Sequence, residues 1–249
     1  MSEAWEKNWV RLPLEGAYNV RELGGYPASM GRPTLFHRFL RSDSLFGLTQ
    51  ADEEFLYGYG VRTVVDLRGD NEAAAHPDPQ IGPDVAHVHV PLFDVNIAAE
   101  DDERDNPELA HLSAEQVYLM VLEKKEQIAR CMRAFIDAPE GCVLFHCSAG
   151  KDRTGIVAYL LMSLAGCDRW DCLTSYIPSR INLMRAEWFI DQWHQEMTYE
   201  HRAQFDSRIE TLSYAIEQVD SWGQTVAYLH DCGLDYMELA KLRTRMLKD

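Results

Sequence analysis

One short stretch of this chain holds a cysteine, an arginine and a threonine at a spacing that can do chemistry. Cys147 is followed by five residues and then by Arg153 and Thr154. The apolar run 143–145 before it predicts a short buried strand, and the run 156–162 after it predicts a buried helix. The residues between these two elements are therefore predicted to form a tight loop that ends at a helix N-terminus.

Such a loop has the properties of an anion-binding site. Backbone amides at a helix N-terminus, helped by the helix dipole, bind anions and favour the thiolate form of a nearby cysteine. Arg153 offers a planar fork that can bind two phosphate oxygens, and Thr154 can donate a hydroxyl hydrogen bond to the sulfur. A thiolate that faces a bound phosphate can attack phosphorus and form a phosphocysteine. The residues predicted to bind phosphate are Ser148, Ala149, Gly150, Lys151, Asp152, Arg153 and Thr154.

A plainer interpretation is that Cys147 is a small buried apolar side chain and Arg153 a surface charge. That interpretation would be favoured for an isolated cysteine, but here the strand, the spacing and the helix all agree with an anion site. A zinc site at His146 and Cys147 would need further ligands, and neither Cys-x2-Cys nor His-x3-His spacing is present. We therefore expect no metal and no cofactor, with Arg153 and the loop amides stabilising the charge.

Residues 146–155, His-Cys-Ser-Ala-Gly-Lys-Asp-Arg-Thr-Gly, resemble the signature loop of cysteine-dependent phosphatases. The interior is similar to that of bacterial tyrosine phosphatases with a His-Cys-x-Ala-Gly-Lys-Asp-Arg-Thr-Gly loop, a group that includes phosphoinositide phosphatases. Lys151 resembles the loop lysine of tensin-homologue lipid phosphatases, and Asp152 resembles the aspartate before the arginine in myotubularins. The resemblance implies a protein tyrosine phosphatase that acts on phosphotyrosine, phosphoinositides or both through a phosphocysteine.

Other segments carry the same resemblance. Residues 19–25, Asn-Val-Arg-Glu-Leu-Gly-Gly, and 41–45, Arg-Ser-Asp-Ser-Leu, are similar to two elements of that family. The family also has an acidic residue shortly after an Asp-Leu-Arg triplet. In this chain the triplet is residues 66–68, and Glu72 is in the place of the acidic residue. Arg21 is expected either to approach the active site or to form a surface pair with Glu22.

Three carboxylates compete for the role of general acid. Asp66 ends a predicted strand, at the edge where α/β sheets bind ligands, although a simple pair with Arg68 is an equal alternative. Asp94 follows another predicted strand, in the position where many cysteine phosphatases carry their acid. Asp152 lies within the loop itself and is near the site by construction.

Lys151 suits a second phosphate on an inositol ring, and a solvent-facing charge is the alternative. Other functions stay open. A cysteine phytase acting on inositol polyphosphates would have a loop ending in Gly-x-Gly-Arg, unlike this one. A catalytically silent phosphate-binding module would not need Cys147 and Arg153 intact. An arsenate reductase or thiol-redox enzyme would need a resolving cysteine, and Cys142 lies on the preceding strand, where its reach is doubtful.

The predicted elements alternate between strands and helices, and the resemblance implies an α/β fold with a mostly parallel central sheet flanked by helices. The whole chain, 1–249, is expected to be one phosphatase domain, with 183–220 a helical lid or insertion. Strands are predicted at 9–14, 34–40, 61–67, 85–90 and 143–145, and helices at 50–57, 113–138, 156–165, 168–177 and 236–247.

The composition describes a single globular domain: 249 residues, 46% hydrophobic and 26% charged. The net charge of −16 argues against nucleic acid or an anionic membrane as a standing partner, so the expected partner is the phosphorylated protein or phosphoinositide substrate. Residues 1–10 lack the apolar core of a signal peptide, and the run 155–167 is too short to span a bilayer. Because Cys147 must be reduced, a cytoplasmic location is expected.

Overall fold

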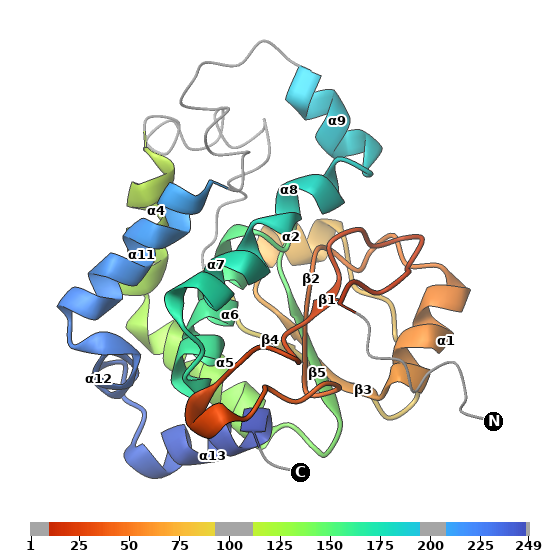
Figure 1. Ribbon diagram of the computed structural model, residues 1–249. Coiled ribbons are helices and arrows are strands. Elements are labelled where there is room, and N and C mark those ends of the chain that lie inside the picture. The colour runs from red at the N-terminus through yellow and green to blue at the C-terminus, as the bar shows by residue number, and fades with distance from the viewer. Residues whose placement is uncertain (1–9, 93–111, 195–207, 248–249) are drawn as a thin grey trace.

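The computed structural model describes residues 10–92, 112–194 and 208–247. Within these residues a sheet with the strand order β1-β2-β5-β3-β4 lies at the centre (Figure 1). The strands β2, β5, β3 and β4 are parallel, and β1 pairs antiparallel with β2. The fold is therefore α/β with a mostly parallel sheet, as predicted. The strands are β1 (Arg21–Glu22), β2 (Phe39–Ser42), β3 (Val61–Asp66), β4 (Ala86–His89) and β5 (Cys142–His146).

Helices flank the sheet and account for most of the C-terminal half of the described chain (Figure 1). They are α1 (Gln50–Tyr59), α2 (Asp70–Ala75), α4 (Ala114–Glu123), α5 (Lys125–Asp137), α6 (Asp152–Ala165), α7 (Arg169–Tyr176), α8 (Pro178–Leu183), α9 (Glu187–His194), α11 (Ile209–Ser221), α12 (Gln224–Asp231) and α13 (Tyr236–Leu247), with a 3-10 turn at Ser29–Gly31.

Both faces of the sheet are covered, which is why β5 is apolar along nearly its whole length and buried throughout. Val143 and Phe145 point into the larger core, which they share with α5 and α6. Leu144, between them, points into a second core formed with α1 and the N-terminal segment. This alternation fixes the register of β5 and places its C-terminal end, followed by Cys147, at one edge of the sheet.

The ends of several helices are fixed by capping contacts. The Thr49 hydroxyl accepts a hydrogen bond from the Asp52 amide, and the Asp52 carboxylate accepts one from the Thr49 amide, so the start of α1 is a capping box. Gly60 and Gly166 end α1 and α6 in the left-handed conformation that glycine adopts without strain. The Asp168 carboxylate caps the start of α7, where it accepts a hydrogen bond from the Asp171 amide at 2.9 Å.

Three predicted elements differ in the structure. Residues 9–14 form no strand within their described part, where Arg11 makes only an isolated bridge. The strand predicted at 34–40 is displaced toward the C-terminus, to β2. The single helix predicted over 113–138 is two helices that meet at Lys124, whose ψ of 54° is not helical. Near this break the Tyr228 hydroxyl donates to the Leu122 carbonyl at 2.7 Å. The helix predicted at 168–177 ends as expected, and Pro178 begins α8, which is a favourable place for proline.

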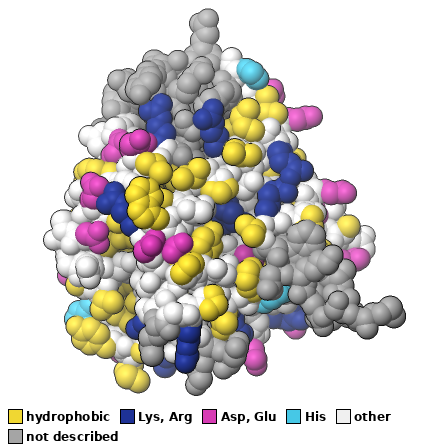
Figure 2. All heavy atoms as spheres, in the orientation of Figure 1, with side chains coloured by type: hydrophobic (Ala, Val, Ile, Leu, Met, Phe, Trp, Pro, Cys, Tyr) yellow, Lys and Arg dark blue, Asp and Glu magenta, His cyan; other side chains and the backbone are white. Residues whose placement is uncertain are grey.

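Among the described residues, no helix is long and apolar enough to cross a bilayer. Figure 2 shows that lysine and arginine side chains lie among aspartate, glutamate and apolar side chains on the face turned to the viewer. The acidic excess of the chain therefore does not form a uniform negative shield on that face.

Candidate active site

The loop that follows β5 lies where three parallel strands end together. In the register of the sheet, His146 of β5 stands beside Ser42 of β2 and Asp66 of β3. The chain segments that continue from β2 and β3 therefore flank the loop 147–152 on both sides. The Leu67 amide, for example, donates a hydrogen bond to the His146 carbonyl at 2.9 Å.

The carbonyl groups of residues 148–151 all accept hydrogen bonds from the scaffold around the loop. In a planar trans peptide the amide points away from the carbonyl of the same unit. The amides of 149–152 therefore turn to the opposite side, toward the interior of the loop. The donors are the Ser44 amide (2.9 Å to Ser148), the Asn19 side-chain amide (2.9 Å to Ala149 and 3.2 Å to Gly150) and the Arg41 guanidinium (2.9 Å to Gly150 and 3.3 Å to Lys151).

The position of Gly150 shows how closely the loop packs on this scaffold. Its φ is +63°, in the left-handed region that favours glycine. A Cβ added there would lie 2.3 Å from the Ser42 carbonyl oxygen. The loop can therefore adopt this path only with glycine at position 150.

The structure brings Cys147, Arg153 and Thr154 together as their spacing predicted. Cys147 is buried, and the Thr154 hydroxyl donates to its sulfur at 3.1 Å. Burial lowers the pKa of Arg153, but the hydrogen bonds and charge of Glu72 and the charge of Cys147 raise it by more, so the guanidinium stays cationic. A thiol and a permanent cation thus flank the inward-facing amides.

Glu72, near the start of α2, fixes the direction of the Arg153 guanidinium. Its two carboxylate oxygens accept from Arg153 Nη1 at 2.5 Å and Nη2 at 2.9 Å, which uses two of the five N–H donors. The Ser148 hydroxyl donates to the same carboxylate, and so does the Gly69 amide at 2.9 Å. Burial raises the pKa of Glu72, but these partners outweigh it and hold the pKa below its ordinary value.

Asp152 lies at the first position of α6 and is held by a chain of hydroxyl groups. The Tyr118 hydroxyl donates to the Asp152 carboxylate at 2.8 Å and lies 2.8 Å from the Tyr176 hydroxyl. Burial and the nearby Asp152 raise the pKa of Tyr118, so Tyr118 remains a proton donor. The Lys151 ammonium lies 3.5 Å from the same carboxylate and is 4% exposed, so the alternative of a solvent-facing lysine is wrong.

Asp66 forms part of a separate buried network. Both of its oxygens accept from Arg68, at 2.8 Å and 2.7 Å, and Arg68 also pairs with Asp78 at 2.9 Å. Asp78 in turn lies 2.9 Å from His146 Nε2. Burial raises the pKa of Asp66, but the hydrogen bonds and charge of Arg68 lower it by more. The net pKa is below its ordinary value, so Asp66 is normally a carboxylate.

The same network contains side chains of the types that bind metal ions. Potential ligand atoms of Asp66, Asp78 and His146 lie within 4.8 Å of one another. Arg68, however, bonds to both carboxylates and supplies the positive charge that a cation would bring. The cluster is therefore organised around arginine.

The remaining predicted site residue, Asp94, lies outside the described residues. Arg21 is buried and bonds toward α7, so the alternative of a surface pair with Glu22 is wrong. Sequence reasoning noted Glu72 without giving it a contact and did not assign Asn19, Arg41 or Tyr118 to the site. Asn19 and Arg41 could have been assigned to the site from the sequence, because they lie in the segments 19–25 and 41–45, which resemble elements of the phosphatase family.

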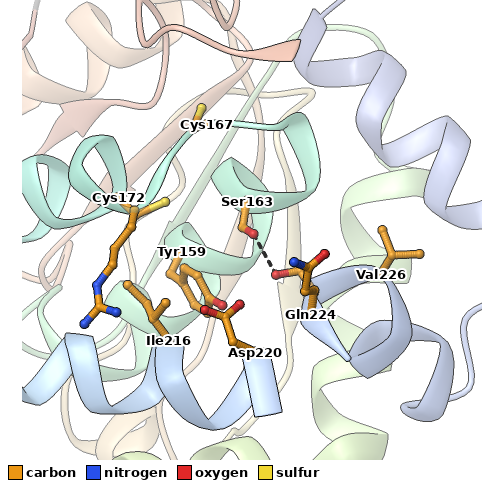
Figure 3. Close-up of a pocket in the computed structure, with 10 residues that line it drawn as sticks. Tyr159, Ser163, Cys167, Cys172, Ile216, Asp220, Gln224 and Val226 are labelled. Carbon is orange, nitrogen blue, oxygen red and sulfur yellow. Dashed lines mark hydrogen bonds between the residues drawn. The ribbon is translucent and has the colours of Figure 1, made fainter. Parts of the chain in front are cut away.

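Two other features lie near or along α6. Leu183, Ala186 and Phe189 of the α8–α9 segment form a small cluster with Ala149 of the loop. Farther along α6, a hollow of about 260 Å³ is lined by Tyr159 and Asp220 among others. Figure 3 shows these side chains on the helices around it. None of the predicted site residues lines it.

A family model described as the tyrosine phosphatase family matches residues 12–248. A tyrosine-protein phosphatase from Nostoc commune is 29% identical over 158 residues, which is 57% of this chain and 48% of that protein. The triple specificity protein phosphatase PtpB of Mycobacterium tuberculosis is 26% identical over 278 aligned residues, covering 94% of this chain and 98% of that protein. The solved structure of TpbA from P. aeruginosa has 16% identity and a TM-score of 0.35, over 74% of this chain and 93% of that one.

The lowered pKa of Glu72 makes the stability of the site depend on pH. Because the pKa is lower in the folded state, the pair with Arg153 contributes stability above the ordinary value of 4.5 and loses it as the pH falls through the folded pKa. Glu72→Gln should therefore lower the free energy of unfolding by about 3 kcal/mol at pH 7, and the difference from wild type should shrink toward pH 3. Urea unfolding at several pH values measures this, with the exposed Glu140→Gln as control. A difference that stays constant with pH would contradict the assignment.

Proposed function

The chain belongs to the tyrosine phosphatase family, and from that premise we propose that it hydrolyses phosphomonoesters through a phosphocysteine on Cys147. The observation that carries the proposal is the loop itself, in which a cysteine, inward-facing amides and an arginine held by Glu72 converge. In the proposed first step the Cys147 thiolate attacks phosphorus in line and the P–O bond to the leaving group breaks. The amides of 149–152 and Arg153 hold the equatorial oxygens, where charge spreads in the transition state.

We assign the general acid to Asp152. It follows the loop directly, and the Tyr118 hydroxyl and the Lys151 ammonium hold its carboxyl group in place. Asp152 would protonate the leaving oxygen, and its carboxylate would then accept a proton from the water that attacks the phosphocysteine and releases phosphate. Asp66 suits the role less well, because both of its oxygens are engaged by Arg68 and its lowered pKa favours the ionised form.

The substrates proposed are phosphotyrosine and phosphoinositides. Lys151 adds a positive charge to the loop, which supports recognition of a second phosphate on an inositol ring.

We propose that residues 1–249 form one phosphatase domain. A cytoplasmic location fits the six free, buried cysteines. The segment 183–220 was expected to be a lid. Within its described residues, only the part 183–194 supports that role, because it packs against Ala149 of the loop. By contrast, α11 packs into the larger core through Leu212.

The assignments of Cys147 and Asp152 are tested by substitution. Cys147→Ser should bind inorganic phosphate but turn over at less than about a hundredth of the wild-type rate, because a hydroxyl is a far weaker nucleophile. Asp152→Asn should lower kcat about 10²-fold or more on a phosphotyrosyl peptide, and less on an aryl phosphate with a good leaving group. Asp66→Asn is the matched comparison, and a larger loss there than at Asp152 would move the acid to Asp66.

The substrate class is tested with a panel and one further substitution. Phosphate release is measured from a phosphotyrosyl peptide, a phosphoseryl peptide and the mono- and bisphosphorylated phosphoinositides. Lys151→Ala should lower kcat/KM about tenfold on bisphosphorylated lipids, because a charge-assisted contact to the second phosphate is lost, and much less on the peptide. A preference for phosphotyrosine that is unchanged in Lys151→Ala would show a protein phosphatase and contradict the lipid assignment.

A further inference from the structure

Two arginines lie opposite each other in the sheet, behind the phosphate-binding loop. Arg21 of β1 is in register with Arg41 of β2, on the two neighbouring strands labelled in Figure 1. The two residues are 2% and 1% exposed. Like charges directly opposite on adjacent strands destabilise a sheet, and burying unpaired charges is costly. The pair therefore calls for a compensating negative charge.

The protein supplies little of that charge. Both guanidinium groups donate to the Ser175 carbonyl, Arg21 at 3.0 and 2.8 Å and Arg41 at 3.2 Å. Ser175 lies in the last turn of α7, where a helix end carries only about half a negative charge. Within the described chain neither arginine bonds to a carboxylate, and Arg41 Nε bonds to nothing. The carboxylate of Asp43 acts on Arg21 from a distance, since it accepts from the backbone amides of Tyr18 and Asn19.

The loop lies on the other side of this pair. Arg41 Nη2 donates to the carbonyls of Gly150 and Lys151, whose peptide amides turn toward the interior of the loop. Burial lowers the pKa of Arg41 to about 10, and burial and the charge of Arg41 lower the pKa of Arg21, yet guanidinium groups stay cationic at pH 7.

The ionisable groups whose charge acts favourably on Arg41 are one thiol and three tyrosine hydroxyls. They are Cys147 and the hydroxyls of Tyr26, Tyr118 and Tyr176. Tyrosine hydroxyls are neutral at pH 7. Cys147 also interacts with the Arg153 charge and accepts a hydrogen bond from the Thr154 hydroxyl. The thiolate, and the phosphate that it faces, are thus the negative charges that can balance the buried pair.

We propose that Arg21 and Arg41 form a buried positive charge behind the loop that stabilises the Cys147 thiolate and the bound phosphoryl group. The proposal rests on the phosphatase function proposed above and deepens it. Arg21 and Arg41 do not touch the substrate; they are positioning residues that act through the loop peptides. The competing explanation is that Arg41 only braces the loop through its two hydrogen bonds.

Charge and bracing are separated by a pair of substitutions. Arg41→Lys keeps the charge and loses the fork, whereas Arg41→Gln keeps an amide donor and loses the charge. The dissociation constant for inorganic phosphate is measured by calorimetry at pH 7, and the alkylation rate of Cys147 by iodoacetate is followed against pH. Arg41→Gln should weaken phosphate binding about tenfold and move the alkylation profile about one pH unit higher, while Arg41→Lys stays within about threefold of wild type. Equal losses in both variants, or wild-type binding in Arg41→Gln, would overturn the proposal.

Arg21 gives a second test, because it bonds to none of the carbonyls of 148–151 directly and reaches them only through Asn19, whose side-chain oxygen accepts from Arg21 and whose side-chain amide donates to the loop. Arg21→Gln should weaken phosphate binding in the same direction, and Arg133→Gln, which removes a distant arginine paired with Glu238, should not. If a glutamine variant does not fold, the lysine variants decide, since a tenfold loss in a variant that keeps the charge contradicts the proposal. Neither measurement needs turnover, so a wild type that binds phosphate but hydrolyses no aryl phosphate would contradict the proposed function and leave this inference standing.

Discussion

The outward orientation of the carbonyl groups in residues 148–151 is the constraint on which the site depends. Four carbonyls are fixed by donors from the N-terminal segment and from β2, and this leaves the amides of the same peptides facing inward. An anion site made of backbone needs such fixation, because a loop that relaxed would turn its carbonyl dipoles toward the ligand. The close approach of Gly150 to the Ser42 carbonyl shows how little freedom the loop has.

The electrostatics follow from the same arrangement. A chain with a net charge of −16 must hold an anionic substrate by local positive charge. Arg153 supplies that charge at the front of the loop, and the Arg21–Arg41 pair lies behind it. The Glu72 carboxylate neutralises part of this positive charge, but it also fixes the direction of the Arg153 guanidinium. The site thus combines buried charges that are unfavourable for folding with a geometry that suits a doubly charged phosphoryl group.

The sequence predicted the parts of this site that are close together along the chain. Cys147, Arg153 and Thr154 belong to one strand–loop–helix unit, so local patterns were enough to place them. The contacts of Glu72, Arg41 and Tyr118 join segments about 30 to 110 residues apart, and only the order and register of the strands decide which of them meet. For the same reason the sequence around Asp66 was compatible with a general acid and with a partner of Arg68. Only the folded structure shows the short distances between Asp66 and Arg68. The local pattern likewise gave no sign of the helix break at Lys124, near which the Tyr228 hydroxyl, from a distant part of the chain, donates to the Leu122 carbonyl.

The central claim is that Cys147 carries the phosphoryl group during turnover. The most direct measurement is to quench the reaction with a phosphorylated substrate in its first turnovers and locate the phosphoryl group by mass spectrometry of the digested protein. The account predicts a phosphoryl adduct on the peptide that contains Cys147, absent from Cys147→Ser. Turnover with no adduct at any time, or an adduct on another residue, would contradict it.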